Sequence, residues 1–254
     1  MRFLALILPL LATSAMADET CIKMSSTAGI GAFEEDLSEL YSQGMLALER
    51  VPSLLETIYT RSPELCYTTQ LDGAHGYFDI DQNRIYVSSA LSKNMQVGVF
   101  LHEVRHLDQI EIGACPSDDL DMREYAQAIF ALEADASAIS LMIAWDLKEQ
   151  GKPSVWDALS SWDTQSDIAS RFAEEMNASG NMGAAVSAAF DQWYASDFRR
   201  TQYYLSTCSE YLDRQDTTHA IPSYQLLPTD FYAELCKLPN GLNYQCSAPE
   251  SAIR

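Results

Sequence analysis

The 254-residue sequence predicts a predominantly α-helical fold of the α+β class, with a small antiparallel sheet or hairpin. Three observations support this prediction. Apolar residues recur with helical periodicity along most of the chain. Between residues 66 and 88 the pattern changes to short runs rich in β-branched and aromatic residues. The sequence also shows no linker, internal repeat or low-complexity tract, so residues 18–254 are expected to form a single domain.

The expected elements can be placed along the chain from periodicity and from residues that start or stop helices. Two β-rich runs, 77–80 and 84–87, flank the polar turn Asp81-Gln82-Asn83 and predict a hairpin. Gly151 and Pro153 are expected to stop a long helix over 121–150. The tail from 214 onward is expected to be mostly loop. The other predicted helices cover 32–60 with a break at Val51-Pro52, 92–112, 154–176 and 182–213.

The first 17 residues have the pattern of a signal peptide. Arg2 supplies a positive charge, residues 3–11 are apolar apart from one proline, and Ala15-Met16-Ala17 fits a small-x-small cleavage site. We therefore expect cleavage after Ala17 and an exported protein, either periplasmic or secreted. The apolar run is too short to span a bilayer, which needs about 20 residues, so no stable membrane insertion is expected.

The cysteine content agrees with export. Six cysteines, an even number, in an exported chain predict three disulfides. The last two are close in sequence, and a disulfide between them would close the C-terminal tail. The sequence has no CxxC pair, which argues against a cysteine zinc site and against thioredoxin-like redox chemistry. The six cysteines are Cys21, Cys66, Cys115, Cys208, Cys236 and Cys246.

The charge and the missing motifs exclude several classes of function. The chain carries 16 Lys and Arg against 36 Asp and Glu, a net charge of −20. Nucleic acids are not expected as partners, because phosphate binding needs clustered basic residues. The sequence contains no phosphate-binding Walker loop, no dinucleotide-binding glycine pattern and no nucleophilic-serine elbow.

The segment that indicates chemistry is His102-Glu103-Val104-Arg105-His106, an H-E-x-x-H motif within a predicted helix. Two histidines four residues apart lie on one helical face and can reach the same Zn²⁺. Glu103 then lies beside the open coordination position, where it can act as a general base. The apolar residues expected to hold the opposite face in the core are Val97, Phe100, Val104 and Leu107.

A zinc site needs a third protein ligand, and Glu133 on the following helix is the best candidate. Small residues lie within about 40° of Glu133 on its helix and would allow close approach to the motif helix. Asp135 projects about 160° away from Glu133, so the two cannot both be ligands. The other candidates that stay open are Glu124, Asp135 and His219.

The combination of H-E-V-R-H with the later segment E-A-D-A-S-A resembles zincin metallopeptidases with a Glu third ligand. It is similar to the ImmA/IrrE-like group and to exported bacterial proteins described as "putative metallopeptidases". The resemblance covers about residues 75–145, including the hairpin before the motif helix. It implies that His102, His106 and Glu133 bind zinc and that Glu103 is the catalytic base. Ser137 stands where thermolysin-like enzymes often carry Asp, so different groups are expected to orient a ligand histidine.

Other polar residues are weaker candidates for the site. His75, Tyr203 and Tyr204 are candidates for stabilising a transition state, although a loop position for the histidine and aromatic core packing for the tyrosines are the favoured explanations. Arg105 is expected to form a structural ion pair with Asp135 or Asp108.

The sequence favours an exported zinc-dependent metallopeptidase that hydrolyses peptide bonds in a peptide or protein substrate, with a zinc-activated water and Glu103 as general base. Two alternatives stay open at this point. One is a non-catalytic zincin-scaffold binding module of the cell envelope, which would bind zinc without cleaving. The other is a disulfide-stabilised helical protein with an accidental motif, which would bind no stoichiometric metal.

Overall fold

A computed structural model describes residues 19–24, 35–69, 74–219 and 223–249, so the predicted signal peptide lies outside the described residues. Within these ranges the fold is mostly helical with a small sheet, which confirms the predicted α+β class. The helices are α1 (Glu35–Leu48), α2 (Pro52–Arg61), α3 (Lys93–Glu111), α4 (Met122–Glu149), α5 (Ser154–Ser160), α6 (Ser166–Ser179), α7 (Met182–Trp193), α8 (Asp197–Thr218) and α9 (Phe231–Leu235). The strands are β1 (Thr20–Lys23), β2 (Glu64–Thr68), β3 (Gly76–Asp79) and β4 (Arg84–Ser88).

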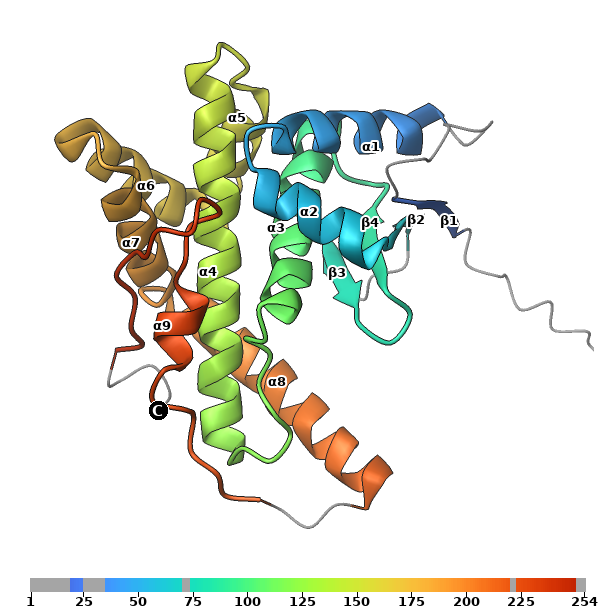
Figure 1. Cartoon of the computed structure of the whole chain (residues 1–254), viewed down its shortest axis with the longest axis vertical. Helices are drawn as coiled ribbons and strands as arrows, with labels where there is room; N and C mark the ends of the chain where they lie inside the picture. The colour runs from blue at the N-terminus through green and yellow to red at the C-terminus, as the bar shows by residue number, and fades with distance from the viewer. Residues whose placement is uncertain (1–18, 25–34, 70–73, 220–222, 250–254) are drawn as a thin grey trace, which may run out of the picture.

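Helix α4 is the element around which the others pack. It runs the length of the molecule, with α3 and the sheet on one side and α6 and α7 on the other (Figure 1). By length and composition α4 could cross a membrane, but 83% of its most apolar window is buried inside the fold. Core helices of globular domains have this composition because they are covered on all sides. The central position of α4 places its polar residues inside the protein, where each needs a partner.

The sheet has the strand order β1-β2-β4-β3. The predicted hairpin is present as the antiparallel pair β3–β4, and Asn83 adopts a positive φ of 54° in its turn. Two strands were not predicted, and β2 pairs with β4 in parallel, so the sheet is mixed rather than antiparallel. Two parallel strands need a crossover connection between them, and here the connection from β2 to β4 contains β3. β3 lies at the edge of the sheet and packs against α3.

The motif helix α3 begins where the sequence predicts. Ser92 caps it by accepting a hydrogen bond from the backbone N–H of Met95. Gly113, with φ of 76°, follows its end. The residues expected on its apolar face are all buried, which fixes the helix between the sheet and α4: Val97, Phe100, Val104 and Leu107.

The helices after α4 are shorter than predicted. The segment expected over 154–176 is divided into α5 and α6, and the one expected over 182–213 into α7 and α8. Ser196 starts α8 by accepting a hydrogen bond from the N–H of Arg199, an N-cap that periodicity alone does not reveal. The tail is mostly loop as expected, apart from the short helix α9.

The disulfide prediction is wrong in part. The structure pairs Cys21 with Cys66 and Cys236 with Cys246, but leaves Cys115 and Cys208 as free thiols. These two lie in different surroundings. Cys115 is in the loop after α3 near Arg61, whereas Cys208 is on α8 in hydrogen-bond contact with Tyr204.

Two free thiols per chain are therefore the expected result of thiol titration in denaturant without reductant. The same titration after full reduction should give six thiols, the number of cysteines in the sequence. Fewer than two thiols before reduction would show that Cys115 and Cys208 are oxidised, and more than two would show that an observed disulfide does not form.

Candidate metal centre

Two helices bring a cluster of metal-binding side chains together. His102 and His106 point from α3 toward Glu133 on α4, and their Nε2 atoms are 3.1 Å apart. The Nε2 atom of His102 is 3.3 Å from one oxygen of Glu133, and that of His106 is 3.4 Å from the other. Two imidazoles and one carboxylate facing a common point form a donor set typical of metal sites.

Small residues surround Glu133 on α4. The face of α4 around Glu133 carries small side chains that are almost fully buried, as the sequence predicts: Ala126, Ser137 and Ser140. Larger residues there would separate the helices and move the carboxylate away from the histidines.

The charges around the cluster favour a cation. Burial raises the pKa of Glu133, but the two neighbouring histidines outweigh it and hold that pKa well below the usual range of a glutamate. Burial lowers the pKa of His106, but the Glu133 carboxylate and a hydrogen bond to Gln109 raise it to about 9. Glu133 therefore stays ionised and stabilises positive charge at the point where the three side chains meet.

Glu103 lies beside the cluster without being part of it. Its side chain is buried, and burial raises its pKa above the ordinary value of a glutamate. His102 and His106 oppose this shift, as does a hydrogen bond donated by the backbone N–H of Phe78 on β3. A Cβ atom at Gly76 would lie 3.3 Å from a Glu103 oxygen and 2.8 Å from a backbone carbonyl, so β3 can approach this closely only with glycine there.

A hydrogen bond orients one of the two histidines. The Nδ1 atom of His106 is 2.8 Å from Oε1 of Gln109, one helical turn further along α3. The amide nitrogen of Gln109 donates to the backbone carbonyl of Leu132 at 2.9 Å and to the carboxylate of Asp135 at 2.7 Å. Because the amide nitrogen has these two acceptors, its oxygen must face His106. In the neutral form that can bind a metal, His106 then carries its proton on Nδ1, and Nε2 is the nitrogen that faces the cluster.

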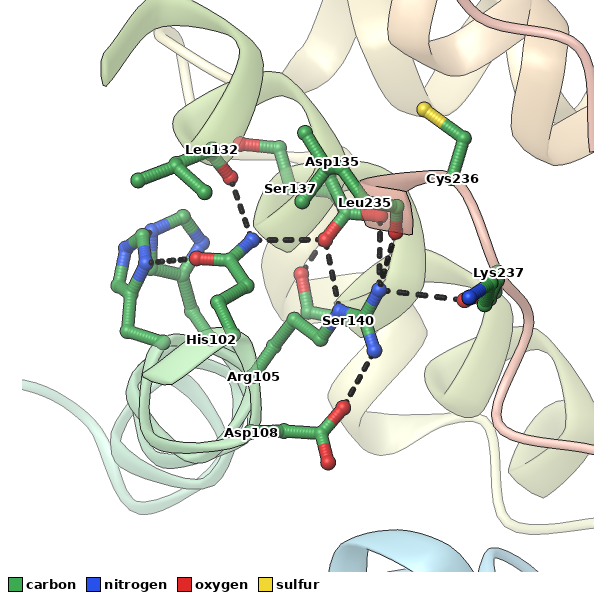
Figure 2. A network of polar contacts seen from close by, with 12 residues as sticks. His102, Arg105, Asp108, Leu132, Asp135, Ser137, Ser140, Leu235, Cys236 and Lys237 are labelled. Carbon is green, nitrogen blue, oxygen red and sulfur yellow. Dashed lines mark hydrogen bonds and ion pairs between the residues drawn. The ribbon is translucent and has the colours of Figure 1, made fainter. Parts of the chain in front are cut away.

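Arg105 forms the expected ion pair, and it pairs with both Asp135 and Asp108. Arg105 binds Asp135 through two hydrogen bonds of 2.6 and 3.1 Å and Asp108 through one of 2.5 Å. Figure 2 shows the guanidinium between these carboxylates and the backbone of Leu235 and Lys237, whose carbonyls accept at 3.1 Å each. Each of the three guanidinium nitrogens donates to at least one acceptor, and a buried charge is tolerated only when it is paired in this way.

A cavity of about 520 Å³ opens next to His102 and Glu103. One wall is aromatic and aliphatic, with Leu159, Trp162, Trp193 and Phe198. The charge of Arg199 in this wall is neutralised, because its guanidinium binds Asp167 and three backbone carbonyls.

Two of the weaker candidates line this cavity. His75 lies at its edge against the ring of Trp162, at a centroid distance of 4.9 Å. Tyr203 donates its hydroxyl to Glu133, and burial together with that carboxylate raises the pKa of the phenol well above 10.

The remaining candidates lie elsewhere. The hydroxyl of Tyr204 is hydrogen-bonded with Cys208 instead of facing the cavity. Glu124 accepts from the backbone N–H of Leu227, Asp135 binds Arg105, and His219 is exposed at the end of α8. None of them reaches the two histidines of the motif in the part of the chain that the structure describes.

Sequence reasoning missed two residues that organise the site. Gln109 falls within about 20° of His102 on the helical wheel. A polar residue on the same helical face as the two histidines could therefore have been predicted to contact one of them. Tyr244, which donates to Asp135 at 2.6 Å, gives no such signal because it comes from the distant C-terminal loop.

Comparison with known proteins agrees with a metal centre. Residues 14–246 match the family described as "Putative metallopeptidase family (DUF6782)", and because this match covers most of the sequence, the chain belongs to that family. The family description indicates a hydrolase that depends on a metal. No curated protein and no solved structure matches the chain.

Proposed function

We propose that the chain is an exported zinc-dependent metallopeptidase in which His102, His106 and Glu133 hold the ion and Glu103 is the general base. The observation that carries this proposal is the meeting of three donor groups at distances of 3.1–3.4 Å. Ligands of a tetrahedral zinc ion, bound at 2.0–2.1 Å, are about 3.3–3.4 Å apart. The residues present therefore fit zinc, and one of them, His102, lines the adjoining cavity together with Glu103.

The site residues divide the work of peptide hydrolysis. A bound zinc ion lowers the pKa of a water ligand toward about 7 and polarises the scissile carbonyl. Glu103 accepts the proton of the attacking water and passes it to the leaving amine. Burial suits Glu103 to this work because it raises the pKa of the carboxylate toward neutral pH. The N–H of Phe78 keeps the Glu103 side chain in place.

The edge strand β3 and the cavity define where the substrate lies. β3 has β4 on one side only among the described residues, and an extended peptide can pair with its other side. The apolar wall of the cavity then receives one side chain of that peptide. Because Arg199 is neutralised by Asp167, this wall favours a bulky apolar side chain over an acidic one.

Tyr203 is the proposed stabiliser of the developing oxyanion, because it lines the cavity and its hydroxyl is hydrogen-bonded to Glu133 of the cluster. The variant Tyr203→Phe should keep its zinc and lower kcat about 10²-fold with little change in KM, since one oxyanion donor is lost. Tyr204→Phe is the matched control, because Tyr204 does not line the cavity, and it should leave kcat unchanged. Equal kcat values for Tyr203→Phe and the wild type would remove Tyr203 from the mechanism.

Export is supported by the two disulfides, which form in oxidising compartments. The predicted cleavage after Ala17 can be checked by sequencing the N-terminus of the protein recovered from outside the cytoplasm. A mature chain is expected to begin at Asp18.

Cleavage of a diverse peptide library, read by mass spectrometry, tests the proposed function. Zinc-loaded protein should cleave a subset of peptides that share a bulky apolar residue near the cut. Removal of the metal by a chelator should stop cleavage, and added zinc should restore it. A stoichiometrically zinc-loaded protein that cleaves no member of the library would contradict the peptidase proposal and favour the binding module.

A further inference from the structure

We propose that the loop closed by the Cys236–Cys246 disulfide, called here the C-terminal loop (236–246), is a positioning element of the metal centre. It acts on His106 through Asp135 and Gln109, and Arg105 contributes to the same connection. This inference rests on the proposed function only in requiring that the site binds zinc. It does not require that the protein cleaves peptides.

The connection begins at His106. Gln109 is the only described side chain within hydrogen-bond distance of Nδ1 of His106, at 2.8 Å. An amide can turn over and present its nitrogen instead, which would oppose the Nδ1–H donor. The orientation that suits His106 is kept because Asp135, at 2.7 Å, and the carbonyl of Leu132 both accept from the amide nitrogen.

Asp135 is in turn placed by residues outside α4. It is fully buried, and its oxygens accept hydrogen bonds from Arg105, Gln109 and Tyr244. The bond from Tyr244, at 2.6 Å, is donated by the C-terminal loop. Without this loop the carboxylate would lose one donor, and its remaining contacts would all come from α3.

Arg105 also binds this part of the chain, at the end of the loop that begins with Cys236. Its guanidinium donates to the carbonyls of Leu235 and Lys237, the two residues that flank Cys236 (Figure 2). The backbone N–H of Tyr244 donates to the carbonyl of Cys236 at 3.1 Å, so both anchor points belong to one closed turn. The disulfide joins the two ends of that turn.

The loop and the residue just before it, Leu235, therefore supply three polar groups that α3 and α4 cannot supply by themselves: the carbonyls of Leu235 and Lys237 for Arg105, and the hydroxyl of Tyr244 for Asp135. In a buried network each bond supports the next, and a missing partner loosens the others. Loosening Asp135 releases the amide of Gln109, and the ring of His106 loses its fixed direction. Loss of a partner that orients a metal ligand typically weakens metal binding by about 10–100-fold.

The test is the zinc dissociation constant of the full mature chain, measured by competition with a chromophoric chelator. The double variant Cys236→Ser, Cys246→Ser should raise this constant about 10-fold. The matched control is Cys21→Ser, Cys66→Ser, which removes the other disulfide, between β1 and β2, two strands away from β3. The control should bind zinc as the wild type does.

The melting temperatures of the zinc-free variants separate positioning from general stability. Cys21 and Cys66 are 45 residues apart, whereas Cys236 and Cys246 are only 10 apart. In the chain-entropy account the longer loop contributes more stability, so the control should melt at the lower temperature. The variant that is more stable should thus bind zinc more weakly. If zinc affinity instead falls in the same order as the melting temperature, or does not fall for the Cys236 and Cys246 variant, the proposal is overturned.

A second pair of variants covers the case in which a disulfide variant does not fold. Tyr244→Phe removes only the hydroxyl that reaches Asp135 and keeps the buried ring. Tyr211→Phe removes a comparable buried hydrogen bond, to the carbonyl of Leu120, outside the network. Zinc binding should weaken several-fold for Tyr244→Phe and stay at the wild-type value for Tyr211→Phe. Equal affinities for the two would also overturn the proposal, whereas a wild type that binds no zinc would refute the proposed function instead.

Discussion

Replacement of Glu103 by glutamine is expected to lower kcat by about 10²–10⁴-fold while the protein keeps its zinc and its fold. Glutamine has nearly the same size and can still accept the hydrogen bond from Phe78. It cannot take a proton from the attacking water, so only the proton transfer is lost. Glu103 is not one of the three converging donors, and for this reason its substitution should leave the metal content unchanged.

The measurement compares kcat on a peptide selected from the library with zinc content determined on the same preparation. Glu111→Gln provides a control for the loss of one negative charge on α3, because Glu111 is exposed and pairs with Arg61 at the surface. This control should retain full activity. If the Glu103 variant cleaves at the wild-type rate, Glu103 is not the base.

Replacement of Arg105 by methionine is expected to lower the free energy of unfolding by about 3–5 kcal/mol. Arg105 is 2% exposed, and the Asp135 and Asp108 side chains that it pairs with are 0% and 9% exposed. Methionine fills much of the same volume but leaves two buried carboxylates without their cation. Removal of one partner from a buried ion pair costs far more than the pair contributes in net terms.

Urea unfolding of the zinc-free protein measures this effect without a contribution from metal binding. The surface pair of Arg61 with Glu111 is the comparison, since both side chains are about 40% exposed. Arg61→Met should change the unfolding free energy by no more than about 1 kcal/mol. Equal effects for the two arginine variants would show that the buried network does not stabilise the fold.

The part of the site that lies on one helix could be predicted from the sequence. A helix places residues i and i+4 on the same face, so the H-E-x-x-H spacing itself predicts the meeting of His102 and His106. The same periodicity selects Glu133, because its face of α4 is lined by small residues, and separates it from Asp135. The pairing of Arg105 follows from the cost of leaving either charge unpaired in a core.

The contributions from distant segments could not be predicted. Tyr244 and the carbonyls beside Cys236 reach the network only because the C-terminal loop folds back over α4, and no periodicity indicates this contact. The strands β1 and β2 have four and five residues and show no clear alternation, so they gave no signal. The even number of cysteines indicated disulfides, and the short spacing of the last two indicated the Cys236–Cys246 pair, but nothing in the sequence revealed that Cys115 and Cys208 are free.

The zinc content of the purified mature protein, by elemental analysis, tests the central claim most directly. The wild type should contain about one zinc per chain, as a site with three protein ligands requires. His106→Ala removes one of the three converging donors and should contain much less than one, while its circular dichroism stays helical. A wild type without stoichiometric zinc, or a His106→Ala variant that retains the full amount, would contradict a metal centre formed by His102, His106 and Glu133.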